Sequence, residues 1–126
     1  MAVNILIVDD SAVVRAMILK TLKVAGVPVG EAYQAADGKA GLEALEANWI
    51  DLVFADINMP IMTGEEMIDR MRQNPAWRDL PVIVVSTEGS QTRIEQLRQK
   101  GARFIHKPFA PEVVREVVQE IIGIHT

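Results

Sequence analysis

The sequence predicts an α/β fold in which helices cover a parallel β-sheet, and three observations support this. Short apolar runs alternate with longer segments of helical periodicity along the chain, as in successive βαβ units. Several short runs are almost continuously aliphatic, which is typical of strands buried on both faces. The 126 residues form five strands and five helices without a linker or repeat, so we expect one domain.

The first half of the chain is expected to hold the strands Asn4–Val8 and Glu31–Ala35 and the helices Ser11–Ala25 and Lys39–Ala47. The strand pattern is weaker in Glu31–Ala35 than in Asn4–Val8, because polar residues interrupt it. Apolar residues at helical spacing define the buried stripes of both helices: Val14, Met17, Ile18, Leu22, Leu42 and Leu45. Gly26 follows the first helix, where glycine favours a helix end.

The second half repeats this alternation, with strands predicted at Asp51–Ala55, Val82–Val85 and Arg103–His106. Helices are predicted between and after them: Glu65–Gln73, Gly89–Lys100 and a last helix from Pro111. Their apolar stripes are Met67, Ile68 and Met71, then Ile94 and Leu97, and finally Val113, Val114, Val117, Val118, Ile121 and Ile122.

Composition excludes several classes of protein. There are 13 Lys and Arg against 17 Asp and Glu, a net charge of −4, and no basic cluster that would bind nucleic acid. The chain has no cysteine, which rules out thiol chemistry and disulfides and fits a reducing compartment. Its start resembles neither a signal peptide nor a membrane span. We therefore expect a cytoplasmic protein that binds neither membrane nor nucleic acid directly.

Polar residues follow the predicted strands at the points where the strands end. Asp9 and Asp10 follow the first strand, Asp56 the third, Ser86 the fourth and Lys107 the fifth. Because ligands of open parallel sheets bind beyond the carboxyl ends of the strands, we expect these side chains to converge at one edge.

The acid pair Asp9 and Asp10 permits two interpretations. Asp10 and Ser11 are both good helix caps, although one cap needs only one of them. Two adjacent acids facing a third also indicate a bound cation, and hard oxygen ligands favour Mg²⁺ over zinc. No glycine-rich phosphate loop occurs in the chain, so a flavin or dinucleotide site has little support.

Asp56, Lys107 and Ser86 each have an ordinary interpretation: a turn residue, a surface lysine and a strand-end hydroxyl. Their joint placement favours phosphoryl transfer. Asp56 lies where a carboxylate can attack phosphorus while the metal and Lys107 offset the charge of the transferred group. The product would be an aspartyl phosphate, a reaction that depends on alignment and charge compensation.

These residues resemble the receiver domain of two-component response regulators over essentially the whole chain. The matching blocks are ILIVDDS, DLVFADINMPIMTG, LPVIVVS and GARFIHKPF, in the family's order and spacing. The resemblance implies a flavodoxin-like three-layer sandwich with strand order 2-1-3-4-5. It also implies that residues 1–126 form a single receiver domain, which we expect to have no output domain.

The resemblance also implies a role for each site residue. Asp56 would be the phospho-acceptor, and Asp9, Asp10 and the backbone carbonyl of Asn58 would join it in binding Mg²⁺. Ser86 would donate a hydrogen bond to a phosphoryl oxygen, and Lys107 would pair with the phosphoryl group. The Lys107–Pro108 peptide bond would be cis.

Four positions would control the phosphorylated state. Ser86 and Phe104, the family's switch aromatic, would move together on phosphorylation. Asn58 and Glu88 would tune attack by water on the phosphorylated Asp56. We expect a phospho-acceptor that dephosphorylates itself, not a turnover enzyme. Phe104 could also be an ordinary core aromatic.

The expected partners are a sensor histidine kinase and a downstream protein. The downstream protein would bind the face formed by the fourth helix, the fifth strand and the fifth helix, around Ile94, Leu97, Phe104 and Val114. Chemotaxis is favoured by the DDSxxxR start, which ends at Arg15. We expect a monomer, with dimerisation on phosphorylation left open.

Other functions stay as alternatives. These are a phosphorelay intermediate outside chemotaxis, a pseudo-receiver scaffold, and a phosphatase like the haloacid dehalogenases, whose nucleophile follows the first strand instead. His106 and His125 are interpreted as structural or incidental, since one lies in a strand and the other near the chain end.

Overall fold

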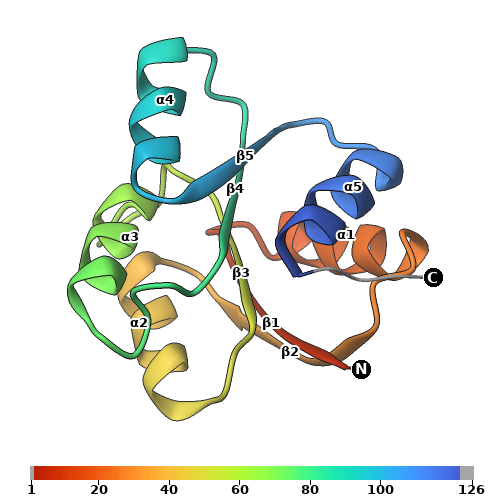
Figure 1. Cartoon of the computed structure of the whole chain (residues 1–126), viewed down its shortest axis with the longest axis horizontal. Coiled ribbons are helices and arrows are strands. Elements are labelled where there is room, and N and C mark those ends of the chain that lie inside the picture. Colours follow the sequence, from red (N-terminus) through yellow and green to blue (C-terminus); the bar gives the residue numbers. More distant parts are fainter. Residues whose placement is uncertain (1, 123–126) are drawn as a thin grey trace.

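The computed structural model describes residues 2–122, which form one five-stranded parallel sheet with helices on both faces (Figure 1). The sheet has the order β2-β1-β3-β4-β5, which confirms the topology implied by the resemblance. The strands are β1 (Val3–Val8), β2 (Val29–Ala35), β3 (Leu52–Ala55), β4 (Val82–Ser86) and β5 (Ala102–His106). The helices are α1 (Ala12–Val24), α2 (Gly38–Ala47), α3 (Gly64–Gln73), α4 (Gln91–Gln99) and α5 (Pro111–Ile122).

Two apolar cores lie on opposite faces of the sheet. Alternation along β1 shows the division, because Ile5 and Ile7 belong to one core and Leu6 and Val8 to the other. Helices α1 and α5 cover the first face, and α2, α3 and α4 cover the second (Figure 1). The central strands β3 and β4 are buried on both sides, so the continuous apolar runs were correctly interpreted.

Polar caps determine where several helices begin. Ser11 accepts a hydrogen bond from the backbone of Val14 at the start of α1. Thr63 and Glu66 form a capping box at the start of α3. The fourth helix was predicted from Gly89, but it begins at Gln91 because Ser90 caps it. Capping thus fixes boundaries that apolar spacing alone leaves uncertain.

Two apolar residues assigned to buried stripes are exposed. Met17 on α1 is 54% exposed and Val113 on α5 is 45% exposed. Each lies at the margin of its stripe, beyond the reach of the sheet. The longest helix has 13 residues, and among residues 2–122 no helix combines the length and apolar character needed to span a bilayer.

Ile61 occupies a strained turn in the link between β3 and α3. Its φ is 68°, and the backbone of Met62 donates to the carbonyl of Pro60 at 2.7 Å, which closes a three-residue γ-turn around it. A β-branched side chain is unfavourable at positive φ. Ile61 is also 78% exposed, so removing its side chain sacrifices little buried apolar surface.

We expect Ile61→Gly to stabilise the protein by about 1 kcal/mol, the relief of strain outweighing the entropy cost of glycine. Urea denaturation followed by circular dichroism measures the change. Ile61→Ala removes the branched side chain but keeps a Cβ at positive φ, so it should recover only part of the gain. A less stable glycine variant would contradict the account.

Candidate functional site

Three carboxylates meet at the carboxyl edge of the sheet. Asp9 and Asp10 follow β1, and Asp56 follows the adjacent strand β3. One oxygen from each side chain can be chosen so that all three lie within 4.8 Å of one another. The structure therefore brings together the acids that the sequence placed at strand ends.

Lys107 places its ammonium group between two of these acids. Its Nζ lies 3.3 Å from Asp9 Oδ2 and 3.4 Å from Asp56 Oδ2. Its backbone N–H donates to the Ser86 carbonyl at 2.9 Å, which anchors the residue beyond the β4–β5 pairing. The Lys107–Pro108 peptide bond is cis, as the resemblance implied.

Backbone groups hold the two inner carboxylates in place. Asp9 Oδ1 accepts from the Ser11 N–H at 2.9 Å, and Asp56 Oδ1 accepts from the Ile57 N–H at 2.7 Å. The side chain of Ser11 caps α1, and Asp10 is exposed. The capping interpretation therefore applies to Ser11 and does not account for Asp10.

This donor set fits a hard divalent cation. Three carboxylates supply only oxygen ligands, and the exposure of Asp10 leaves room for water to complete the coordination. Asp9, Asp10 and Asp56 would hold the ion. When bound, Mg²⁺ would neutralise charge on the acids and on a phosphoryl group beside them.

Burial raises the pKa of Asp9, and the Asp56 charge acts in the same direction. The Ser11 hydrogen bond and the Lys107 ammonium oppose this shift without cancelling it. A carboxyl whose pKa is higher in the folded than in the unfolded protein favours folding while protonated. Stability therefore falls as pH rises from about the ordinary value of 3.8 through the raised pKa.

We expect Asp9→Asn to be more stable than the wild type in metal-free buffer at neutral pH. Asparagine keeps an oxygen for the Ser11 N–H but carries no buried charge. Thermal unfolding should show a higher midpoint for the variant, and a smaller gain on adding Mg²⁺ than the wild type shows. A variant that gains as much from Mg²⁺ as the wild type would argue against Asp9 as a ligand.

Ser86 is the last residue of β4, the strand next to β3, and its hydroxyl is partly engaged. It is buried, and its Oγ accepts from the Glu88 N–H at 3.2 Å, which leaves the hydroxyl proton available for another acceptor. The Glu88 carboxylate faces Arg93 at 3.8 Å, and Arg93 also pairs closely with Glu65 of α3. The link after β4 is thereby tied to two helices.

Two other predicted residues lie in the link after β3 and on β5. Asn58 is exposed in the link after β3, two residues from Asp56. Phe104 is half-buried on β5 and packs edge-on against His106, with ring centroids 4.7 Å apart. His106 is thus a packing partner of the candidate switch aromatic, and His125 lies outside the described residues.

Arg15 of α1 forms two hydrogen bonds that link it to the end of β1 and to β2. Its guanidinium donates to the Asp9 carbonyl at 2.5 Å and to Gln34 Oε1 at 2.9 Å. It therefore fixes the backbone that carries the acid pair. The only sequence signal was its place in the DDSxxxR start.

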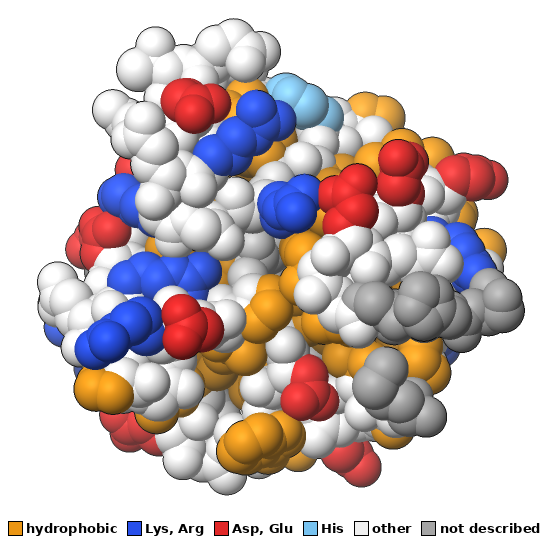
Figure 2. Space-filling view, viewed as in Figure 1, with side chains coloured by type: hydrophobic (Ala, Val, Ile, Leu, Met, Phe, Trp, Pro, Cys, Tyr) orange, Lys and Arg blue, Asp and Glu red, His pale blue; other side chains and the backbone are white. Residues whose placement is uncertain are grey.

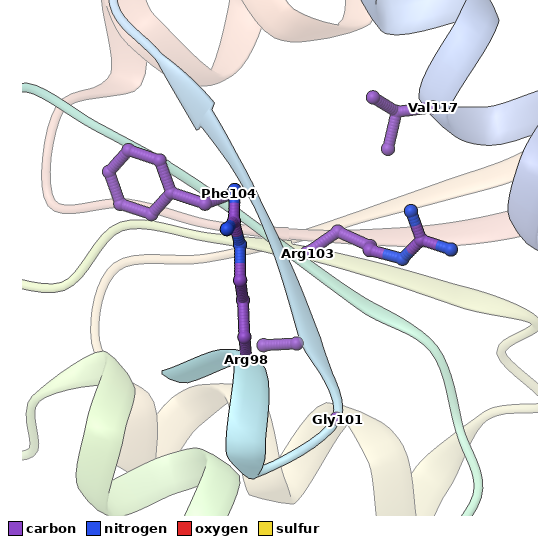
Figure 3. A pocket seen from close by; sticks show the side chains of 6 residues that line it. Arg98, Gly101, Arg103, Phe104 and Val117 are labelled. Carbon is purple, nitrogen blue, oxygen red and sulfur yellow. The ribbon is translucent and has the colours of Figure 1, made fainter. Parts of the chain in front are cut away.

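The predicted output face needs a correction. Ile94, Leu97 and Val114 are at most 3% exposed, because they form the core beneath this face. Its surface instead has a hollow of about 460 Å³ lined by side chains that include Arg98, Arg103, Phe104 and Val117. Figure 3 shows the Phe104 ring and the Val117 side chain on opposite sides of β5.

Comparison with known proteins gives consistent results. The profile of the response regulator receiver domain matches residues 5–119. The chemotaxis protein CheY1 of Helicobacter pylori is 30% identical over 122 residues, which cover 95% of this chain and 97% of the relative.

Solved structures agree along nearly the whole chain. Chemotaxis protein CheY4 of Vibrio cholerae superposes with a TM-score of 0.84 at 32% identity, covering 97% of this chain and all of that one. The CheX–CheY–BeF₃–Mg²⁺ complex of Borrelia burgdorferi contains a chain with a TM-score of 0.84 and 27% identity. The superposition covers 98% of the present chain and 90% of the Borrelia burgdorferi chain.

Proposed function

This chain belongs to the response regulator receiver domain family of two-component phosphorelay signalling, and from that premise we propose that Asp56 accepts a phosphoryl group in a Mg²⁺-dependent reaction. The observation that supports this assignment is the geometry around Asp56. Its carboxylate lies at a strand end, within 4.8 Å of two other acids and beside the Lys107 ammonium.

In the proposed reaction, a carboxylate oxygen of Asp56 forms a bond to phosphorus while the bond between phosphorus and the donor's nitrogen or oxygen breaks. The leaving group takes the electron pair and is protonated. Lys107 and the Ser86 hydroxyl donate to the phosphoryl oxygens and so offset the negative charge of the transition state. Mg²⁺ would supply the second cation.

Attack by water on the same phosphorus would return Asp56 to its free form. We therefore assign the protein as a phospho-acceptor that dephosphorylates itself, not as a turnover enzyme. Asn58 and Glu88 follow Asp56 and Ser86 by two residues each, where their side chains would tune access of that water.

Intact-mass measurement after incubation with acetyl phosphate and Mg²⁺ tests the assignment. We expect a gain of one phosphoryl group that is lost in Asp56→Asn and in the presence of EDTA. Asp51→Asn is a matched control, since this aspartate lies next to the opposite end of β3. No gain with any small phosphodonor would favour a pseudo-receiver that binds partners unmodified.

The proposed partners are a sensor histidine kinase and a downstream protein in chemotaxis. Relatives that match nearly the whole chain carry chemotaxis names, and the Borrelia burgdorferi chain was solved with CheX. The surface around Phe104, Arg98 and Arg103 would present a phosphorylation-dependent face to the downstream protein. Its partner should carry acidic groups to pair with these arginines.

A further inference from the structure

A second surface lies at the end of the sheet opposite the carboxylates. A hollow of about 790 Å³ opens between the link from α2 to β3 and the link from α3 to β4. The chain has only two tryptophans, and both Trp49 and Trp77 line this hollow. We call it the tryptophan groove and define it by Glu46, Trp49, Asp51, Trp77, Asp79 and Pro81.

Trp49 is exposed but held in one orientation. It is 78% exposed, yet its indole Nε1–H donates to Asp51 Oδ1 at 3.0 Å. Asp51 is itself fixed, because its Oδ2 accepts from the backbone N–H of Asn4 at 2.8 Å. The Asn4 side chain also donates to the Trp49 carbonyl at 3.1 Å. An exposed aromatic that is already ordered loses little entropy on binding.

Trp77 forms the opposite side of the groove on an equally fixed segment. Arg72 donates to the carbonyls of Trp77 at 3.2 Å and Leu80 at 2.8 Å, and to that of Lys100 at 2.8 Å. Trp77 is half-buried against the core beneath α2 and α3. Arg72 thus uses its hydrogen bonds on backbone carbonyls and keeps the groove wall in place.

The charges of the groove have one sign. Glu46, Asp51 and Asp79 line it, and its lining residues include no Lys or Arg. Outside the lining, Arg72 contributes charge of opposite sign, since it interacts electrostatically with Asp79. Figure 2 shows hydrophobic surface at the lower edge of the molecule, over the link between α2 and β3, flanked by acidic side chains.

We propose that the tryptophan groove binds an arginine-containing segment of a partner protein, and that it does so independently of phosphorylation. A guanidinium stacks on an indole face and pairs with carboxylates, which matches two tryptophans beside three acids. Tryptophan and arginine are also both enriched among binding hot spots. Apolar side chains also line the groove, and they can contact apolar residues that flank the arginine in the partner segment.

The location supports independence from phosphorylation. The groove adjoins the amino ends of β3 and β4, whereas Asp56 and Ser86 lie at their carboxyl ends. Neither the Ser86 hydroxyl nor Phe104 lines it. A partner bound here would hold the receiver close to its kinase or target in both states and so raise its effective concentration.

The two tryptophans make the test specific, because each gives one indole N–H signal in a ¹H–¹⁵N spectrum. The probe is a capped peptide in which arginine and leucine alternate, with glutamate–leucine and serine–leucine peptides as controls. We expect both indole signals to shift saturably with the arginine peptide and not with the controls.

Variants separate the groove from general surface binding. Trp49→Ala and Asp79→Asn should each lower the affinity for the arginine peptide by about fivefold or more. Ile61→Ala is the matched control, because Ile61 is also 78% exposed and lies in the β3–α3 link. Phosphorylation with acetyl phosphate and Mg²⁺ should leave the affinity within about twofold.

Several outcomes would overturn the proposal. They are the absence of a saturable shift, an equal response to the glutamate or serine peptide, and undiminished binding by Trp49→Ala. Indole signals that move with protein concentration alone would assign the groove to a second copy of this chain. A tenfold change in affinity on phosphorylation would reject independence, whereas failure of phosphorylation itself would count only against the role of Asp56.

Discussion

Gly64→Ala is expected to lower the free energy of unfolding by about 4 kcal/mol, which is a large fraction of a typical domain's stability. A Cβ at this position would lie 2.1 Å from the carbonyl oxygen of Asp56 and 3.2 Å from the Cα of Ile57. Both are backbone atoms, so no flexible side chain can move aside. The backbone N–H of Gly64 also donates to the Ile57 carbonyl at 2.9 Å.

This close approach connects the fold to the site, because Gly64 begins α3 against the backbone that carries Asp56. Urea denaturation measures the loss, and Gly89→Ala is the control, since a Cβ there meets nothing within 4 Å. The control should change stability by no more than about 0.5 kcal/mol. Equal behaviour of the two variants would refute the steric argument.

The parts of the fold that the sequence predicted are those where one strong force dominates. Runs such as residues 5–8 and 82–85 are apolar throughout, and a strand that is buried on both faces removes all of their side chains from water. The carboxylate cluster was predictable for a related reason. A parallel sheet places successive strand ends at one edge, and the strand order that the resemblance implied makes β1 and β3 neighbours, so Asp9 and Asp56 were expected to meet.

The errors occur where several residues compete for the same role. Val113 and Val114 are adjacent valines on α5, and only the register of the helix against the sheet decides that Val114 is buried and Val113 exposed. On α4, the packing of that helix against the sheet buries Ile94 and Leu97, so they cannot form a partner surface. Periodicity defines a stripe but not its margins.

Two other features were not predicted from the sequence, the contact of Arg15 with Asp9 and the tryptophan groove. Arg15 reaches the Asp9 carbonyl, yet its spacing alone does not distinguish this contact from solvent exposure. Trp49 and Trp77 lie 28 positions apart in the sequence and share a groove because the links before β3 and β4 meet at one end of the sheet. The shared groove follows from the topology of the sheet, and the sequence around each tryptophan alone does not indicate it.

Lys107→Ala is expected to slow phosphorylation of Asp56 by about 10²- to 10³-fold, the usual effect of losing one preorganised group that stabilises transition-state charge. The Lys107 Nζ is 3.4 Å from the Asp56 carboxylate and 3.3 Å from that of Asp9. Its side chain is 20% exposed, so water replaces the lost charge poorly. The Lys107 charge lowers the pKa of Asp9, so its removal should raise that pKa further.

The measurement is the single-turnover rate with acetyl phosphate at saturating Mg²⁺, followed by intact mass. Lys100→Ala is the matched control, because Lys100 also pairs with an aspartate, Asp69 at 2.9 Å, but on the surface between α3 and the end of α4. It removes the same charge from the protein without touching the carboxylate cluster, so its rate should stay within about threefold of the wild type. Equal rates for the two variants would show that net charge, and not the ammonium beside Asp56, governs the reaction. A slow Lys107 variant with a normal Lys100 control would instead assign the loss to charge compensation at the phosphoryl group.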